Sequence, residues 1–300
     1  CALSPTVPHG YVDNLADLDA VVRTARWVAS SRWTVAALVE VCDVAVRVPL
    51  PVSGPPVTPA LELARQLVAE AAGAFVVADT DPPAPAPTAD DGAAVLRSAL
   101  PGKLGLSPSV AAGALDLLGI NLAAARLFAE LRDATIGPVA IAAVITRVRR
   151  LGRVLAGARA GDAATLDLLT QHRDLFGIAD FDHIGLASLR RLDLYRSLIE
   201  PWHERGEVPP DLAAAIVGYV PGTGFAPADL ATVAAAVGAD EAFVASLRQE
   251  LPQPADPFAA LEQAVVAGLV CRQVGAPAVL LRLVQSTQSQ ELTAASALLL

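Results

Sequence analysis

Apolar residues recur at every third or fourth position over most of the chain. An α-helix turns once in about 3.6 residues, so this spacing places each set of apolar residues on one face of a helix. We therefore expect an all-α protein in which each helix buries one apolar stripe. The four clearest stripes are Leu15, Leu18, Val22, Ala25 and Val28; Ile141, Val144, Ile145, Val148, Leu151 and Leu155; Leu189, Leu192, Tyr195, Leu198, Ile199 and Trp202; and Phe258, Leu261, Val265 and Leu269.

Residues that begin helices precede several apolar stretches. Ser107 stands before Pro108, and Asp162 precedes a helical stretch that begins near Ala163. Serine and aspartate accept hydrogen bonds from the first free amides of a helix, and proline fits the first helical position. Strand signals are weak, because the alternating stretch VAVRVPLPV holds prolines that cannot lie in a central strand. Little or no sheet is expected.

The helical pattern repeats irregularly and is interrupted by proline. A long helix, a short break and a short helix recur, for example in LVCRQVGAPAVLLRLV. Proline fixes φ and lacks an amide donor, so VPLPVSGPPVTP and ADTDPPAPAPTADD are predicted to be extended connectors. The prediction is an irregular, α-solenoid-like array of helix–turn–helix units. It has an N-terminal helical segment with a proline-rich connector at 1–76, a proline-rich linker or surface loop at 77–92, and a helical shell domain at 93–300.

Composition and charge narrow the possible classes of function. Hydrophobic residues make up 54% of the chain and charged residues 18%, which excludes a disordered protein. The formal net charge of −9 has the wrong sign for a nucleic-acid-binding protein. Basic residues do gather at Arg147, Arg149, Arg150 and Arg153. We interpret them as a solvated helix face that pairs with nearby acids, and a phosphate- or partner-binding strip is the alternative.

Three further features concern processing, membranes and metals. The chain has no methionine, starts at Cys1 and ends in the apolar TAASALLL, so we expect a piece of a longer protein. No run of about 18 apolar residues lacks charges or breakers, and no membrane-spanning segment is predicted. Cys1, Cys42 and Cys271 lie far apart, which indicates neither a zinc site nor a redox motif.

The letters HRDL, from His172 to Leu175, also open the catalytic loop of protein kinases. That loop needs aspartate as a base and asparagine five residues later for magnesium, but Ala179 stands at that distance from Asp174. The later ADFD has Asp182 in place of the glycine of DFG, and no glycine-rich loop precedes it. The only lysine, Lys103, lies in PGKLG rather than in a strand. A kinase is therefore not expected.

We interpret HRDLFG instead as the end of a helix. Leu168, Leu169, Leu175 and Phe176 would bury that end, and Gly177 would close it as the C-terminal cap. Glycine is common there because the cap residue adopts a left-handed conformation.

The remaining polar residues form no catalytic or metal-binding set. No two of the histidines have the HxxxH spacing that directs two imidazoles at one metal; they are His9, His172, His183 and His203. His183 follows Asp182, but adjacent residues do not face each other on a helix, so we favour a structural role over an acid–base pair. Pro221 to Gly224 lacks the lysine of a phosphate-binding loop and is predicted to be a turn. Asp90 and Asp91 are predicted to begin a helix. No catalytic residue, cofactor-binding residue, metal ligand or cofactor is predicted.

Three stretches resemble the A component of the insecticidal toxin complexes, the Tc toxins. The stretch AAVITRVRRLGRVLAGARAGDAATLDLLTQHRDLFGIADF is similar to that family's basic and apolar helix followed by a short break, a histidine and an FG turn. LASLRRLDLYRSLI resembles the next long helix, and FAALEQAVVAGLVCRQVGAPAVLLRLV resembles a long helix, a break and a short helix. The resemblance covers roughly residues 100 to 300, near the family's neuraminidase-like domain.

The resemblance implies a non-enzymatic scaffold. The family's A component is a large secreted homopentamer whose α-helical shell encloses a translocation channel, and a pH change opens that shell. By this resemblance the chain is part of the shell and contacts other parts of the same longer chain. A host receptor would bind regions outside this segment, and the segment itself would not enter a membrane. No receptor-binding insertion, channel helix or sialidase repeat is present, so no sialidase activity is expected.

Two other functions remain open. A general helical adaptor without a toxin role would bind another protein through a groove between helical units. An enzyme is the third possibility, and turnover of ATP or a glycoside that Asp174→Ala abolishes would support it.

Overall fold

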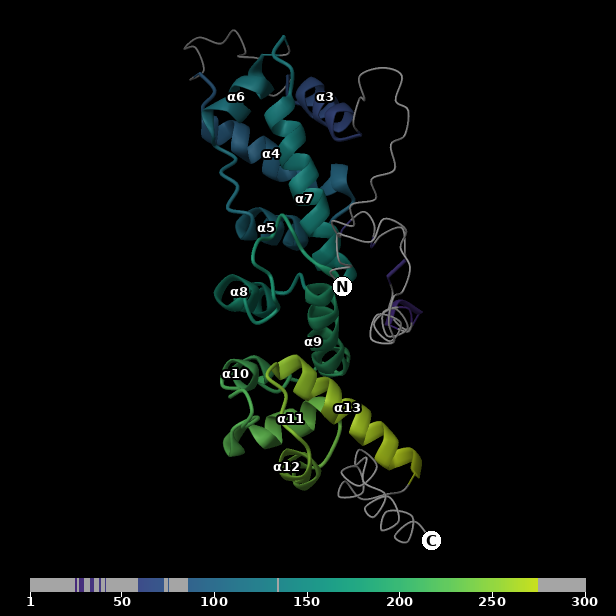
Figure 1. The fold of residues 1–300 in the computed structure, drawn as a ribbon. Coiled ribbons are helices and arrows are strands. Elements are labelled where there is room, and N and C mark those ends of the chain that lie inside the picture. The colour runs from purple at the N-terminus through teal and green to yellow at the C-terminus, as the bar shows by residue number, and fades with distance from the viewer. Residues whose placement is uncertain are drawn as a thin grey trace, which may run out of the picture. The chain divides into compact units, whose positions relative to one another are not determined.

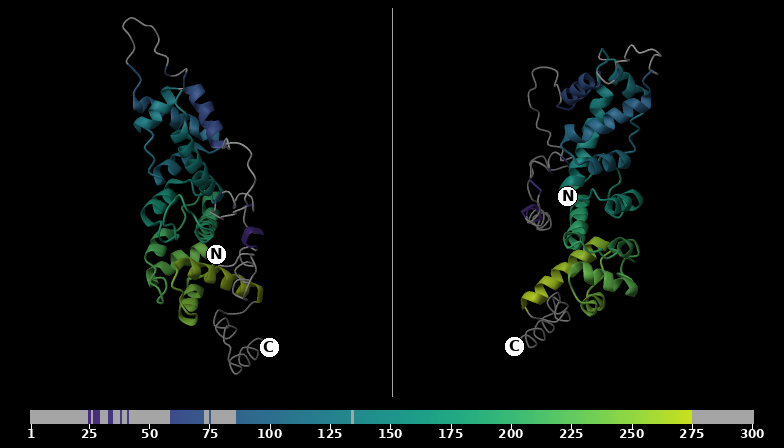
Figure 2. Two further views of the ribbon diagram at one scale, coloured as in Figure 1. Left: turned by 45° about the horizontal axis from the view of Figure 1, so that its top comes forward. Right: turned by 180° about the vertical axis from the view of Figure 1, so that it is seen from behind.

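The computed structural model describes residues 59–72, 86–133 and 135–274, together with Phe75 and isolated positions between 25 and 41. This described part is all-α, as predicted, and its only β-type pairing is an isolated antiparallel bridge between Val220 and Gly224. The chain divides into two compact units, Cys1–Leu189 and Arg190–Leu300. Figures 1 and 2 show the helices of each unit.

The predicted domain limits can be set beside these two units only where the residues are described. The segments 1–76 and 77–92 fall largely outside the described residues. The boundary between the two units lies after Leu189, so the predicted domain 93–300 spans both. Of the apolar stripe between Leu15 and Val28, only Ala25 and Val28 are described, and Ala25 is exposed.

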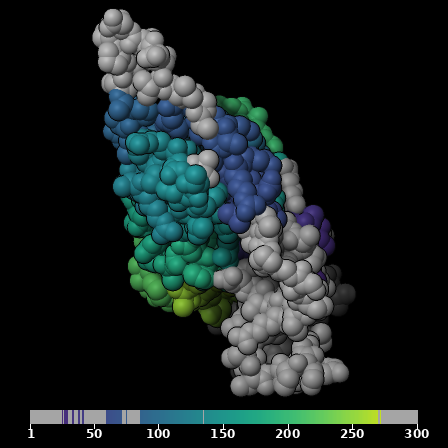
Figure 3. Space-filling view, turned by 90° about the horizontal axis from the view of Figure 1, so that it is seen from above, coloured from purple at the N-terminus to yellow at the C-terminus, as the bar shows by residue number. Residues whose placement is uncertain are grey.

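Unit 1 is built around one long helix, α7. The unit contains α3 (Pro59–Ala72), α4 (Ala89–Leu104), α5 (Pro108–Leu117), α6 (Ala125–Arg132), α7 (Val139–Gly157), α8 (Ala163–His172) and the start of α9 (Leu186–Glu204). Helices α3, α4, α5 and α6 all pack on α7, which runs between them in Figure 1. Figure 3 shows the blue and teal atoms of this unit packed closely against one another. The centre of the unit is therefore the surface of α7.

The predicted stripe on α7 forms this core. Ile141, Ile145, Val148 and Leu155 are fully buried, Leu151 nearly so, and Val144 is half-buried. Burying a Leu, Ile or Val side chain contributes about 1.5–3 kcal/mol, so this stripe is a major source of the unit's stability.

The predicted helix starts are also present. The Ser107 hydroxyl accepts a hydrogen bond from the Val110 amide, with Pro108 at the first helical position of α5. The Asp162 carboxylate accepts one from the Thr165 amide at 3.0 Å and so begins α8. Each bond satisfies an amide that lacks a partner within its own helix.

Helix α7 begins with an unusual buried charge. Glu130, on α6, is only 2% exposed, and its carboxylate accepts hydrogen bonds from the amides of Ala140 (2.8 Å) and Ile141 (3.0 Å). Pro138 precedes α7 and supplies no side-chain cap. A carboxylate from a neighbouring helix therefore fills the position where a helix N-terminus attracts negative charge.

The described part of unit 2 contains two long helices and four shorter elements. They are α10 (Leu212–Val217), the 3₁₀ turn η2 (Pro227–Asp229), α11 (Leu230–Val237), α12 (Glu241–Glu250) and α13 (Pro257–Val274), together with α9 from Arg190 onward. Helix α11 packs against α10, α12 and α13. Within this unit Arg191 of α9 pairs with Asp256 at 2.8 Å and Arg190 with Glu262 at 3.1 Å, so α9 is tied to the start of α13.

The predicted apolar stripe on α9 is buried except at Trp202, which is half-buried. On α13 only the first two residues of the predicted stripe are buried. Phe258 and Leu261 are buried, whereas Leu269 is 48% exposed. The buried residues of the second half are small: Ala264, Ala267 and Gly268. Leu247 and Leu251 of the preceding segment pack on the two alanines, so the buried face of α13 follows small residues rather than the large ones.

Among the described residues, no single helix has both the length and the hydropathy that a membrane crossing needs. The segments Pro227–Val237 and Glu241–Glu250 meet those criteria only as a pair, bent by 114°.

Candidate functional site

The HRDL segment begins at the last residue of α8 and continues as turns. Helix α8 ends at His172. The Gly177 amide then donates to the Asp174 carbonyl at 2.8 Å, and the Ile178 amide donates to the Arg173 carbonyl at 3.0 Å. Phe176 is fully buried while Asp174 is exposed. The apolar residues of the segment thus anchor it, as do the buried Leu168 and Leu169, and its aspartate faces solvent.

The predicted cap at Gly177 is wrong in one respect. Gly177 has a left-handed conformation with φ of 69°, as a cap glycine would, but the residue that ends α8 is Arg173, in a right-handed conformation. The left-handed glycine closes the separate turn that follows. The sequence located the conformation correctly but assigned it to the wrong element, because both a helix end and a tight turn use such a glycine.

The next polar residues hold this segment to α7. Arg147 forms two parallel hydrogen bonds with Asp182, Nε to Oδ1 at 2.7 Å and Nη2 to Oδ2 at 2.6 Å. This two-pronged geometry is the strongest that an arginine makes with a carboxylate. The hydrogen bond to Asp182 raises the pKa of Arg147, which stays charged. The Arg147 end of the predicted basic strip is thus paired with an acid.

His183 does not pair with its neighbour Asp182. Its Nδ1 lies 2.9 Å from the Asp180 carboxylate, and the other oxygen of Asp180 accepts a hydrogen bond from the Asp182 amide at 3.0 Å. That amide bond, followed by the bond to His183, lowers the pKa of Asp180 below its usual value. The three residues form a surface turn, with the His183 side chain 67% exposed, rather than an enclosed acid–base site.

The other residues singled out in the sequence have mainly structural positions. Asp91 and Thr88 form a reciprocal cap at the start of α4, and the bonds from the Thr88 amide and hydroxyl lower the pKa of Asp91. Lys103 pairs with Glu70. Cys271 is half-buried, and burial raises the pKa of its thiol.

Several predicted positions do not come together. His203 is exposed at the end of α9, and His172 lies at the end of α8. His9, Cys1 and Cys42 lie outside the described residues. No group of three His, Cys, Asp or Glu side chains in the described ranges is placed to hold a metal ion.

Unit 2 contains a site that the sequence did not indicate, where two loops meet beside α12. The Tyr219 hydroxyl donates to the Pro254 carbonyl at 2.6 Å, which ties the end of α10 to the loop before α13. Burial, and then the nearby charge of Asp256, raises the pKa of Tyr219 and keeps this donor protonated. Pro221 to Gly224 forms the predicted turn between these anchors, closed by the bridge from Val220 to Gly224.

Gln253 fixes the second loop against the end of α12. Its amide nitrogen donates to the carbonyls of Leu251 (2.9 Å), Arg248 (3.2 Å) and Leu247 (3.4 Å). The last carbonyls of a helix have no partner within the helix, so this side chain acts as a cap. Its amide oxygen lies so close to Gly224 that a Cβ there would come within 2.5 Å, and Gly224 also has φ of 89°. A glycine is therefore required for the turn to approach Gln253.

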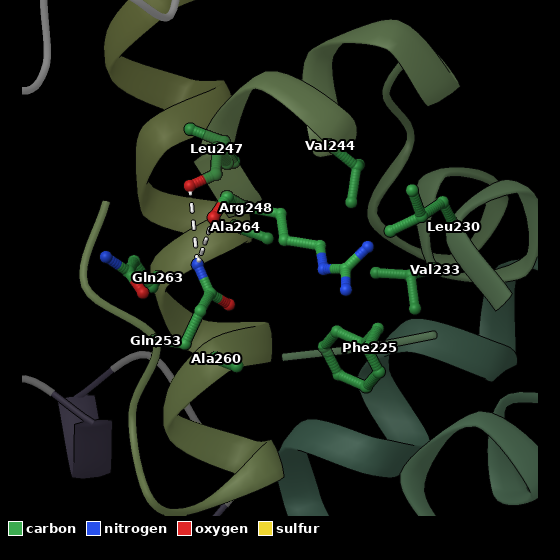
Figure 4. Close-up of a pocket in the computed structure, with 10 residues that line it drawn as sticks. All are labelled: Phe225, Leu230, Val233, Val244, Leu247, Arg248, Gln253, Ala260, Gln263 and Ala264. Atoms are coloured by element: carbon green, nitrogen blue, oxygen red, sulfur yellow. Dashed lines mark hydrogen bonds between the residues drawn. The ribbon is translucent and has the colours of Figure 1, made fainter. Parts of the chain in front are cut away.

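These loops and helices line an open groove of about 720 Å³ that includes Arg248. Its lining residues are Gly222, Thr223, Pro227, Leu230, Ala245, Arg248, Gln249, Leu251, Pro252 and Gln253. A smaller cavity of about 20 Å³ shares Leu230, Arg248 and Gln253 with the groove and continues inward to Phe225, Val233 and Val244. Figure 4 shows the guanidinium of Arg248 directed toward Phe225 and Val233, between α11 and α12.

Arg248 is the charged residue among those that line this groove, and it could bind a ligand group. Its Nε donates to the Thr223 carbonyl at 3.1 Å, which holds the side chain across the turn. No acidic side chain within the described ranges pairs with its terminal nitrogens. The sequence signal was slight, since a single arginine in EAFVASLRQE looks like any solvated helix residue.

Comparisons with known proteins do not extend this picture. No family model matches the chain, and neither a curated protein nor a solved structure matches it. The likeness of three stretches to the Tc toxin A component therefore stays a prediction.

Proposed function

We propose that the chain is a non-enzymatic helical scaffold, a segment of the α-helical shell of a pore-forming insecticidal toxin A component. The observation that carries the proposal is how the polar residues around HRDL are used. Asp182 is bound to Arg147, Asp180 to His183, and Asp162 to the start of α8. Side chains used in this way hold segments of the chain in place, and these three aspartates are engaged in such contacts.

The packing of unit 1 also supports a structural role. The stretch that resembles the toxin family contains α7 and α8, and α7 is buried by four neighbouring helices. Well-packed interiors resist deformation and transmit strain, which suits a shell that must stay closed until a signal opens it. By the same resemblance, the protein is secreted, assembles as a homopentamer and contacts other parts of its own longer chain.

The assembly state tests this proposal. The full reading frame that encodes the chain should be expressed and its product weighed by mass photometry at neutral pH. Five-copy particles with a helical shell visible by electron microscopy are expected. A product that stays monomeric at all concentrations would contradict the proposal.

A catalytic assay tests the enzyme alternative. The purified chain and its Asp174→Ala variant should be incubated with ATP and with glycosides. We expect no turnover by either protein, since Asp174 is exposed on a turn with no magnesium-binding asparagine behind it. Turnover that Asp174→Ala abolishes would replace the scaffold proposal with an enzyme.

One observation favours the adaptor as a second candidate function. The groove around Arg248 is concave, has both polar and apolar walls and carries one charge, as a binding site can. An adaptor without a toxin role would remain monomeric and would bind its partner through this groove. Self-association of the full product, with no partner bound, would favour the shell instead.

A further inference from the structure

We propose that the groove around Arg248 binds an acidic peptide segment, with one carboxylate on the terminal nitrogens of Arg248. The inference concerns unit 2 alone and does not depend on whether the chain belongs to a toxin shell. It rests on three features: the charge of the groove, the small cavity that adjoins the groove, and the open side of the groove.

The charge of the groove calls for a single negative group. Arg248 is the only charged residue among the ten that line it. A guanidinium has five N–H donors, and here Nε is used on the Thr223 carbonyl. Its head lies beside the apolar side chains of Phe225, Val233 and Leu230. A guanidinium partly withdrawn from water gains most from a charged acceptor, and a carboxylate matches its single charge and its fork geometry.

The shape of the site accommodates a carboxylate at its inner end. The inner cavity of about 20 Å³ exceeds the roughly 10–15 Å³ that one water molecule requires, so it admits one oxygen-sized group. The groove of about 720 Å³ shares Arg248 with this cavity. A carboxylate on Arg248 can thus place one oxygen inward while the rest of its chain lies in the groove.

The open side and the rim indicate a peptide rather than a small molecule. Pockets for small molecules usually enclose about 70–90% of the ligand surface. This groove instead lies along the surface between the turn at Thr223 and the exposed Gln249, with Pro227, Leu251 and Pro252 as apolar walls. An extended segment can place small aliphatic or proline side chains on these walls. Arginine in a desolvated setting is also a frequent centre of binding energy in protein interfaces.

The groove is held in its present shape before any ligand binds. Gln253 caps α12 through three carbonyls, Tyr219 fixes Pro254, and Arg248 itself spans the turn to Thr223. A preformed site loses less entropy on binding than a disordered one.

Binding of a defined probe tests the proposal. The probe is the blocked peptide acetyl-Ala-Pro-Glu-Leu-Pro-Ala-amide with a fluorescent label, titrated with the full chain and followed by anisotropy. We expect saturable binding with a Kd on the order of 100 μM, because one charged anchor and a short apolar contact supply modest affinity. Replacing the peptide glutamate with glutamine should weaken binding about tenfold or more, since a charge-assisted hydrogen bond is lost.

Protein variants locate the binding to Arg248. Arg248→Gln should weaken binding about tenfold or more. Arg205→Gln is the matched control: Arg205 pairs with Glu207 and does not line the groove, so the same charge change there should leave the Kd unchanged. If Arg248→Gln fails to fold, the comparison of the glutamate and glutamine peptides on the unaltered chain decides the question.

Four results would overturn the proposal. The first three are no saturable binding up to millimolar chain, equal binding of the glutamate and glutamine peptides, and equal binding by Arg248→Gln and the unaltered chain. Displacement of the probe by inorganic phosphate at lower concentrations than by unlabelled peptide would also overturn it, because the site would then select phosphate.

Discussion

Helices α7 and α13 carry similar apolar stripes in the sequence but differ in how their neighbours cover them. On α7 the stripe is buried from Ile141 to Leu155. On α13 it is buried at Phe258 and Leu261, half-buried at Val265 and 48% exposed at Leu269. Periodicity fixes which residues share a helix face, but neighbouring helices decide whether that face is buried along its whole length.

The two units also satisfy helix ends in opposite chemical ways. In unit 1 the buried carboxylate of Glu130 accepts from the first amides of α7. In unit 2 the amide of Gln253 donates to the last carbonyls of α12. Each side chain matches the partial charge at its helix end, positive at the amino end and negative at the carboxyl end. Both come from outside the helix that they cap, so neither is visible as a local capping motif.

The largest expected effect compares the two stripes directly. Leu155→Ala on α7 should lower the free energy of unfolding by about 2–5 kcal/mol, because it leaves a cavity in a fully packed core. Leu269→Ala on α13 should change it by no more than about 0.5 kcal/mol, since the side chain is half exposed. Urea titrations followed by circular dichroism measure both values. Equal losses would mean that Leu269 is covered in solution and that the contrast between the stripes is false.

The next effect tests the carboxylate at the start of α7. Glu130→Ala should cost about 1–3 kcal/mol, because it leaves the amides of Ala140 and Ile141 buried without an acceptor. Glu130→Gln keeps one acceptor oxygen and the same shape, so it should cost less. Hydrogen exchange at the first turn of α7 locates the loss. If the glutamine variant is as unstable as alanine, the charge matters more than the hydrogen bonds.

The corresponding test in unit 2 concerns Gln253, a hydrogen-bond donor at the end of α12 where Glu130 is an acceptor at the start of α7. Gln253→Ala should cost about 1–2 kcal/mol, because the carbonyls of Arg248 and Leu251 lose their side-chain donor, while the Leu247 carbonyl still accepts from the Leu251 amide. Gln253→Glu should cost more than alanine, since a carboxylate would face those carbonyls with no hydrogen to donate. Thermal unfolding of the two variants side by side gives the order. The reverse order would show that Gln253 contributes by packing and does not cap α12.

The smallest expected effect is on the pH dependence of unit 1. The pKa of Asp180 is lower in the folded protein than in the unfolded chain. Its contribution to stability is therefore complete above the unfolded value of about 3.9 and is lost as the pH falls through the folded pKa. Asp180→Asn should make the loss of stability below about pH 4 shallower.

Asp116→Asn removes the same charge from an exposed position on α5 and serves as the control for this experiment. The comparison is made by urea titration at several pH values. Identical pH profiles for the unaltered chain and Asp180→Asn would show that the bonds to the Asp182 amide and to His183 do not form in solution.

Local sequence signals predicted the fold class and several helix limits correctly. Ser107 and Asp162 begin helices because their side chains reach amides only three residues ahead. The same locality misled at Gly177, where a left-handed glycine indicates a chain reversal without showing whether a helix or a turn precedes it.

Side-chain pairs across long sequence separations could not be predicted. His183 and Asp182 are adjacent in sequence, yet one contacts Asp180 and the other contacts Arg147, 35 residues away. The groove in unit 2 depends in the same way on the approach of Gly224 to Gln253. Such contacts depend on where the backbone returns, and residue type alone does not determine that.

The sequence by itself determined that the described chain is helical, because apolar spacing and helix caps act over a few residues. It also determined that polar residues around HRDL do not form a kinase loop, because the required residue types are missing at the required spacing. Only the tertiary structure decided that Glu130 is buried, that Leu269 of α13 is half exposed, and that Arg248 lines a groove. Burial and the clustering of charge depend on which distant segments fold against one another, and the sequence of neighbouring residues does not determine that.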